Sequence, residues 1–247
     1  MQEYSSKVWG FWGTLLFGVV IFVALSVGQL IPLYIYMLFG EQAITSNSML
    51  RLADSMETDA LLLSISAIGS AFFVLPIVFG IAKLKRGSVL KEYFDVRLFS
   101  WKTFLIWFVV MLLYMVFETY AMRAMGVDET PSFMLNIEFP SILSIALLLF
   151  AVTIVAPLIE ESIFRGFLLK GFMNSFLGVY GAIVLTSALW AVIHFQYEFA
   201  YVFLIFIAGL IFGYARVKSN SILLPMVMHF FMNLVAALGL FYEKGMI

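Results

Sequence analysis

The sequence contains no cysteine, which excludes disulfide bonds, thiolate catalysis and metal sites built from cysteine. Charged residues are also scarce, at 12% of the chain against roughly 25% in an ordinary soluble domain. The formal net charge is −1 and no basic cluster resembles a nucleic-acid footprint, so we expect no nucleic acid among the partners. Histidine occurs only twice, so histidine-dependent chemistry must use His194 or His229.

The chain is instead rich in apolar residues. Hydrophobic residues make up 64% of it, and the mean hydropathy is +1.06. Several apolar runs reach the ~20 residues that a helix needs to cross a bilayer, whereas the short alternating segments of a barrel are not evident. The sequence therefore predicts an all-α fold, a polytopic membrane helix bundle with about seven transmembrane helices.

We expect the spans at residues 8–39, 60–82, 101–125, 140–170, 177–195, 199–216 and 222–242. The first is too long for a signal peptide and lacks a small-residue cleavage site, so we interpret it as a retained span. With the N-terminus in the cytoplasm, 11 of the 14 lysines and arginines lie on the cytoplasmic side, the exceptions being Arg51, Arg123 and Lys244. This predicts an N-in, C-out topology. The basic linker 83–100 would anchor it, either directly or as an amphipathic surface helix.

Two adjacent glutamates and an arginine lie inside the fourth apolar segment. An ionised carboxylate in hydrocarbon costs ~3 kcal/mol or much more, so Glu160 and Glu161 require a functional explanation. Glu161 and Arg165 are four residues apart, so they share one helix face and can pair. Glu160 points about 100° away from Glu161 on the same helix. We therefore predict one supporting ion pair and one carboxylate, Glu160, that is free to react.

The two histidines lie in later apolar segments, each with a partner at helical spacing. His229 and Asn233 project to one side of the seventh span, and Trp190 and His194 share a side of the fifth. At 1.5 Å per residue, Glu160 lies about 15 Å and His229 about 13 Å below the expected cytoplasmic surface. His194 lies about 24 Å below it. Depth therefore favours Glu160 with His229 over Glu160 with His194.

Small residues and a proline predict two local features of the bundle. Ala208, Gly209 and Gly213 give the sixth span a small face that is typical of close helix packing. Pro157 lacks a backbone N–H and is expected to kink the fourth span, either widening a cavity or merely bending the helix.

Three motifs occur in order along the C-terminal half: Glu160-Glu161-x-x-x-Arg165, Trp190-x-x-x-His194 and His229-x-x-x-Asn233. Together they resemble the CPBP family of CAAX prenyl endopeptidase-like and bacteriocin-processing intramembrane proteases, also called the Abi family. The segment Phe164-Arg165-Gly166 is similar to the Phe-Arg-Gly that follows the glutamates in that family. The resemblance covers roughly residues 140–240, and Trp190 stands where the family usually has phenylalanine. We therefore expect N-terminal transmembrane helices and a basic cytoplasmic linker in residues 1–139, followed in residues 140–247 by the four-helix catalytic core that the resemblance implies.

The resemblance implies an intramembrane endopeptidase, metalloprotease-like or a glutamic protease, that acts on a membrane-associated peptide or protein precursor in the lipid bilayer. In such a site Glu160 and His194 would activate a water, and the adjacent ion pair would support them. His229 and Asn233 would stabilise the oxyanion of the tetrahedral intermediate. We expect no cofactor, with Zn²⁺ as the alternative. We expect the site to open to the cytoplasmic side of a bacterial inner or plasma membrane.

Three other interpretations stay open from the residues alone. Two carboxylates and two histidines could bind Zn²⁺, although adjacent glutamates converge poorly on one ion. A chain of this architecture could also be a non-catalytic scaffold, a bacteriocin-immunity factor or a sensor-kinase partner. Buried glutamate and histidine build proton relays in transporters, but no inverted repeat is visible in this sequence.

Overall fold

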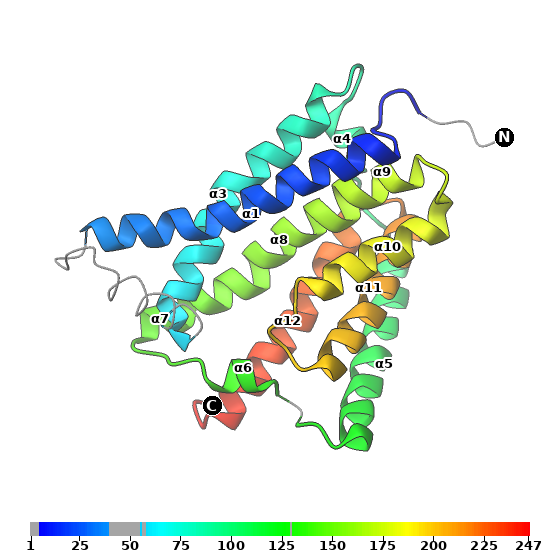
Figure 1. Ribbon diagram of the computed structural model, residues 1–247. Helices are drawn as coiled ribbons and strands as arrows, with labels where there is room; N and C mark the ends of the chain where they lie inside the picture. Colours follow the sequence, from blue (N-terminus) through cyan, green and yellow to red (C-terminus); the bar gives the residue numbers. More distant parts are fainter. Residues whose placement is uncertain (1–4, 40–54, 56–57, 129) are drawn as a thin grey trace.

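The computed structural model describes residues 5–39, 55, 58–128 and 130–247 of the chain. These residues form a bundle of long helices that cross one another obliquely (Figure 1). Within the described ranges there is no strand, only one isolated bridge between Asp59 and Glu138. The predicted all-α polytopic bundle is therefore confirmed.

Each of the seven predicted segments is helical. The long single helices are α1 (Phe11–Phe39), α3 (Ala60–Leu84), α5 (Trp101–Met125), α11 (Phe199–Ser219) and α12 (Leu223–Glu243). The fourth segment is a composite helix of α7 (Ile142–Phe150), η1 (Ala151–Val155), α8 (Ala156–Glu161), η2 (Ser162–Leu168) and α9 (Leu169–Met173). The fifth is α10 (Gly178–Val192), and the short helices α4 (Leu90–Tyr93) and α6 (Ser132–Leu135) lie in connections. Among the described helices six are long and apolar enough to cross a membrane, and α10 is a shorter apolar helix.

Local capping explains where several helices begin and end. The Asp59 carboxylate accepts the backbone N–H of Leu61 at 2.7 Å, and Ser100 caps α5 in the same way. These side chains satisfy amide donors that have no partner inside the helix. Gly126 and Asn220 take left-handed conformations just after α5 and α11, with φ of 68° and 52°. Glycine and asparagine are the residues that adopt this conformation most readily, so both helices stop there.

Close packing joins α10 to α11. A Cβ added to Gly209 would lie 2.9 Å from Ser187 Cβ, and one added to Gly213 would lie 3.1 Å from a methyl group of Ile183. The predicted small-residue face of the sixth segment is therefore a helix-packing face. On the other sides of the composite helix lie α1 with α3, and α12, which contacts both η1 and α8 (Figure 1). The Glu-Glu segment is thus enclosed at the centre of the bundle.

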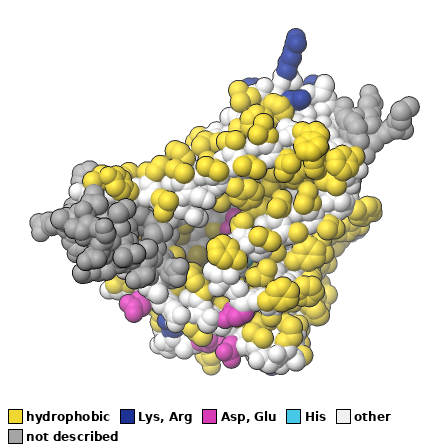
Figure 2. Space-filling model, in the orientation of Figure 1, with side chains coloured by type: hydrophobic (Ala, Val, Ile, Leu, Met, Phe, Trp, Pro, Cys, Tyr) yellow, Lys and Arg dark blue, Asp and Glu magenta, His cyan; other side chains and the backbone are white. Residues whose placement is uncertain are grey.

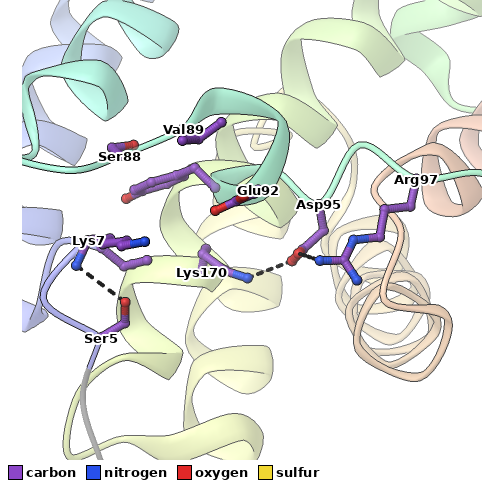
Figure 3. A pocket seen from close by; sticks show the side chains of 10 residues that line it. Ser5, Lys7, Ser88, Val89, Glu92, Asp95, Arg97 and Lys170 are labelled. Carbon is purple, nitrogen blue, oxygen red and sulfur yellow. Dashed lines mark hydrogen bonds and ion pairs between the residues drawn. The ribbon is translucent and has the colours of Figure 1, made fainter.

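Asp95 ties the basic linker to two helix ends. Its buried carboxylate accepts hydrogen bonds from Lys170 at 2.6 Å and Arg216 at 2.7 Å, with Arg97 at 3.7 Å. Burial alone would raise the pKa of Asp95, but the hydrogen bonds and charges of Lys170 and Arg216 outweigh it and hold the pKa below its usual range. The linker is therefore anchored by specific ion pairs. A cavity of about 260 Å³ lies beside this cluster (Figure 3).

The molecular surface is predominantly apolar along the helices. Apolar side chains cover the middle of the face shown in Figure 2, with lysine and arginine side chains at its upper end and most of the visible carboxylates toward its lower end. Exposed leucine, valine and phenylalanine side chains occur along α1 and α5, for example Leu16 at 62% and Leu113 at 65% exposure. Together with the six candidate spans, this surface identifies an integral, multi-pass membrane protein.

Candidate active site

Two π-helical stretches flank the Glu-Glu pair. η1 ends just before α8, and η2 begins directly after Glu161. Single π-helical turns inside α-helices are frequent at functional sites. The N–H of Ala156 donates to the carbonyl of Ala151, five residues back, and the next residue, Pro157, has no N–H. The Val152 carbonyl would accept from the N–H of residue 156 in an α-helix, or from that of residue 157 in a π-helix. Neither donor is available to it here.

Asn233 supplies the missing donor. Its Nδ2 donates to the Val152 carbonyl at 2.7 Å and so joins α12 to the composite helix. The backbone group that Pro157 frees is therefore bonded to a side chain of a neighbouring helix. An amide nitrogen carries two hydrogens, so this bond leaves one of them for another acceptor.

Glu161 and Arg165 form the predicted pair in the interior. Arg165 Nη1 lies 2.9 Å from Glu161 Oε1, and the two side chains are 1% and 0% exposed. His229 Nδ1 contacts the same oxygen at 3.0 Å. The Glu161 carboxylate is thus held from two sides, by His229 of α12 and by Arg165 of its own composite helix.

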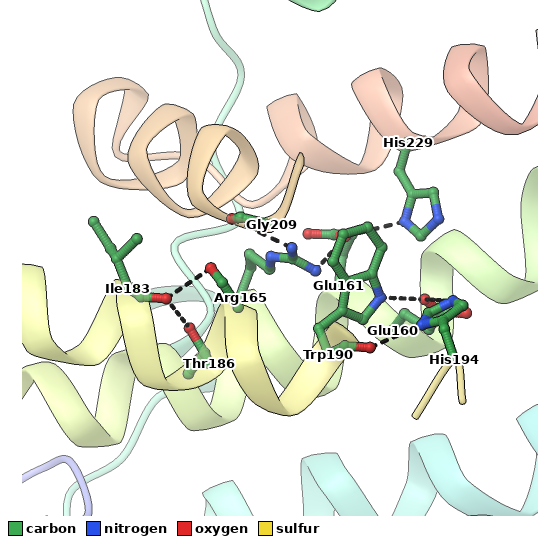
Figure 4. Close-up of polar contacts among 10 residues, drawn as sticks. Glu160, Glu161, Arg165, Ile183, Thr186, Trp190, His194, Gly209 and His229 are labelled. Carbon is green, nitrogen blue, oxygen red and sulfur yellow. Dashed lines mark hydrogen bonds and ion pairs between the residues drawn. The ribbon is translucent and has the colours of Figure 1, made fainter. Parts of the chain in front are cut away.

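Glu160 faces a different and more accessible group of side chains. Its Oε2 accepts a hydrogen bond from Trp190 Nε1 at 2.5 Å and lies 4.0 Å from His194 Nε2 (Figure 4). The side chains of Glu160 and His194 are 18% and 17% exposed, in contrast to the sealed pair beside them. His194 Nδ1 lies 2.8 Å from the Trp190 carbonyl. The two carboxylates of the motif therefore belong to separate environments.

The pairing favoured by depth, Glu160 with His229, is wrong. Glu160 is beside His194, and His229 is bonded to Glu161. Glu160 precedes Met173 by 13 residues and so lies about 20 Å along the composite helix from the turn that joins α9 to α10. The 15 residues of α10 extend about 21 Å from that same turn and end at Val192, just before His194. The two helices share this turn, so Glu160 and His194 lie at similar distances from it. The depths predicted from the sequence were counted from a different reference residue on each helix and did not take this into account.

Two aromatic residues contribute to the site in ways that the motifs do not indicate. The Trp190 ring lies 4.2 Å from Arg165 Cζ, in a cation–π contact, and its centroid is 5.4 Å from the rings of His194 and of His229. Tyr197 follows α10, and its ring is nearly parallel to that of His194, 6.0 Å away. Burial, together with the charge of Glu160, raises the pKa of Tyr197 to about 12, so its hydroxyl stays protonated. The local turn after α10 places Tyr197 there, since its backbone N–H donates to the His194 carbonyl at 3.0 Å.

The arrangement has consequences for metal binding and for acid–base chemistry. Within the described part of the chain, no group of three histidine, aspartate or glutamate side chains is placed to hold a metal ion. What the site does contain is a carboxylate and an imidazole nitrogen 4.0 Å apart, too far for a direct hydrogen bond. That spacing suits a bridging water, which is how a polar contact of this length is commonly completed.

Comparisons with known proteins agree with the motifs. Residues 142–235 match the family model described as type II CAAX prenyl endopeptidase Rce1-like, a stretch that contains every predicted site residue. This match confirms the resemblance to the CPBP family. An uncharacterized 24.3 kDa protein of Escherichia coli is 37% identical over 92 residues, which cover 36% of this chain and 42% of that protein. The similarity thus spans less than half of that relative's length. No solved structure matches.

Proposed function

We propose, from the premise that residues 142–235 form an Rce1-like domain, that this protein is an intramembrane endopeptidase. It hydrolyses a peptide bond in a membrane-associated peptide or protein precursor. The observation that carries the proposal is the division of the Glu-Glu pair. Glu161 is neutralised by Arg165 and sealed, whereas Glu160 is partly accessible and faces His194 across 4.0 Å.

The protonation of His194 follows from its hydrogen bond. The Trp190 carbonyl can only accept, so Nδ1 of His194 carries the proton in that bond. In the neutral ring Nε2 is then an acceptor, and it faces a second acceptor, Glu160 Oε2. A water between them can donate one hydrogen to each at about 2.8 Å. Both acceptors increase the electron density on the water oxygen, which is the purpose of general-base catalysis.

The proton and the bonds balance in two steps. Glu160 takes a proton from the water as the water oxygen bonds to the scissile carbonyl carbon, forming a tetrahedral oxyanion. The oxyanion then collapses, the C–N bond breaks, and the protonated Glu160 returns its proton to the leaving amine. The products are a carboxylic acid and an amine, and Glu160 is again a carboxylate. The acid then gives its proton to the amine, so the products leave as a carboxylate and an ammonium group.

His229 and Asn233 are the proposed oxyanion donors. Asn233 has one amide hydrogen left after its bond to Val152. His229 Nδ1 donates to Glu161, so donation from Nε2 requires a second proton on the ring. With that proton, the group of Arg165, Glu161 and His229 would carry a net charge of +1, which favours a developing oxyanion. A well-aimed oxyanion donor contributes about 3–4 kcal/mol to transition-state stabilisation.

The cytoplasmic opening of the site remains part of this proposal. The concentration of lysine and arginine at the end of the bundle that carries Asp95 and the basic linker supports a cytoplasmic position for that end. A substrate held in the bilayer would present its peptide bond laterally to the partly accessible Glu160. The expected partners are accordingly a membrane-associated peptide and the lipid bilayer itself.

The proposal is tested with protein reconstituted in liposomes and a library of membrane-associated peptides, with cleavage followed by mass spectrometry. Glu160→Gln keeps the shape of the side chain but removes the base, and it should lower the cleavage rate roughly 10²–10⁴-fold. Glu243→Gln, at the exposed end of α12, is the matched control and should cleave at the wild-type rate.

Two outcomes would overturn this mechanism. The first is wild-type cleavage by the Glu160→Gln protein. The second is loss of wild-type activity on chelation with recovery on adding Zn²⁺, which would favour metal-dependent hydrolysis instead.

A further inference from the structure

Trp190 contacts both members of the proposed water-activating pair. Its indole N–H donates to Glu160 Oε2 at 2.5 Å, and its backbone carbonyl accepts from His194 Nδ1 at 2.8 Å. The side chain is 1% exposed, among the most buried large side chains of the described chain. One residue therefore defines the position of the carboxylate and the proton location on the imidazole.

The indole is itself held rigidly. Arg165 lies over its face at 4.2 Å, and the rings of Phe212 and His229 pack around it at 5.8 and 5.4 Å between centroids. A donor fixed in this way directs its hydrogen bond to one place. Glu160, in contrast, has a long side chain whose outer part is accessible, and it would otherwise lose conformational freedom each time the site becomes productive.

We propose that Trp190 is a positioning residue of the site, a role that rests on the proposed endopeptidase function and deepens it. The indole N–H holds Glu160 Oε2 opposite His194 Nε2, so that both acceptors face one water. An indole nitrogen can only donate, so it never competes for that water's hydrogens. The backbone carbonyl of the same residue directs the lone pair of His194 to the same water.

Simple packing of an aromatic ring makes a different prediction. If Trp190 only fills space between Arg165 and the two histidines, a phenylalanine in its place keeps a ring face for the cation and the backbone carbonyl for His194. Trp190→Phe would then change stability but leave the catalytic step intact. If the indole N–H positions Glu160, the same substitution lowers kcat and leaves KM unchanged, because the substrate is not bound by the indole.

The first experiment measures kcat and KM of reconstituted Trp190→Phe protein on a peptide that the wild type cleaves. We expect kcat to fall roughly 10- to 100-fold, the size of effect that follows from a misplaced catalytic group, with KM at the wild-type value. Trp101→Phe, on the exposed start of α5, is the matched control and should keep both constants. A wild-type kcat in Trp190→Phe, whether KM is unchanged or raised, would overturn the proposal.

The second experiment does not depend on cleavage. The five tryptophans give five indole N–H resonances in a ¹⁵N-labelled sample, and the one lost in Trp190→Phe belongs to Trp190. This resonance should shift upfield in Glu160→Ala, which removes the acceptor, and stay in place in Glu243→Gln. An unmoved resonance would overturn the proposal even if the wild type is an active peptidase. A wild type without cleavage would instead overturn the proposed function, and the two failures are thus distinguishable.

Discussion

Arg165→Met tests whether the buried ion pair supports the bundle. The substitution removes the cation and leaves Glu161, which is 0% exposed, with His229 as the remaining partner of Oε1 and no partner at Oε2 within the described chain. Breaking a buried pair by removing one partner destabilises a protein by about 3–5 kcal/mol. For a chain of this length that corresponds to a fall in Tm of roughly 6–20 °C. Methionine replaces much of the lost volume, so a cavity contributes little to the effect.

The assay is thermal unfolding in detergent, followed by intrinsic fluorescence, with SDS titration as a second measure of stability. Lys102→Met, at the exposed start of α5, is the matched control and should change stability by no more than about 0.5 kcal/mol. The double variant Glu161→Gln with Arg165→Met should unfold at a higher temperature than Arg165→Met, because no charge remains buried without its partner. A wild-type Tm in Arg165→Met, or a double variant no more stable than the single one, would refute the reasoning.

Two further predictions concern polar groups outside the Glu-Glu pair. Asn233→Leu should cost about 1–3 kcal/mol of stability because the Val152 carbonyl loses its donor. The same change should cost much less in a Pro157→Ala background, where the backbone N–H of residue 157 is restored. Asp95→Asn should destabilise the protein by about 2 kcal/mol at pH 7, since two charge-assisted hydrogen bonds are weakened. The pKa of Asp95 is depressed in the fold, so its contribution is fully present above pH ~4 and is lost as pH falls through the lower folded pKa.

Each of these two predictions has its own control. For Asn233, equal costs in the wild-type and Pro157→Ala backgrounds would show that the amide does not replace the missing helical donor. For Asp95, the difference in stability between wild type and Asp95→Asn is measured from pH 7 to pH 3, with Glu92→Gln as an exposed acidic control. A difference that stays constant across this range would contradict an ion pair at Asp95.

Much of the architecture was predictable because lipid constrains sequence strongly. A span must be apolar and about 20 residues long, and backbone groups in the membrane must bond within their own helix. These two conditions located the seven helical segments, including α5 at residues 101–125 as predicted. They did not anticipate that α10 would be only 15 residues long, because the apolar pattern continues through residue 195 while the chain already turns after Val192.

The candidate site was predictable as a set of residues but not as a set of contacts. Rare charged residues in an apolar chain identified Glu160, Glu161 and Arg165, and helical spacing paired the last two, as the structure does. Depth wrongly favoured His229 as the partner of Glu160, whereas His194 lies beside Glu160 and His229 is bonded to Glu161. Depth along one helix does not determine which neighbour it meets, because tilt, shared turns and π-helical stretches shift the levels of adjacent helices.

By itself, the sequence determined that this protein is a membrane helix bundle whose fourth segment carries one ion pair, Glu161 with Arg165, and a second carboxylate, Glu160, on a different face of the helix. Those conclusions follow from the cost of charge in hydrocarbon and from the period of the α-helix, which act along a single segment. Only the tertiary structure decided that His194 meets Glu160, that His229 meets Glu161, and that Trp190 connects the two carboxylate environments. Such pairings depend on how separate helices cross, and no local pattern in the chain records that.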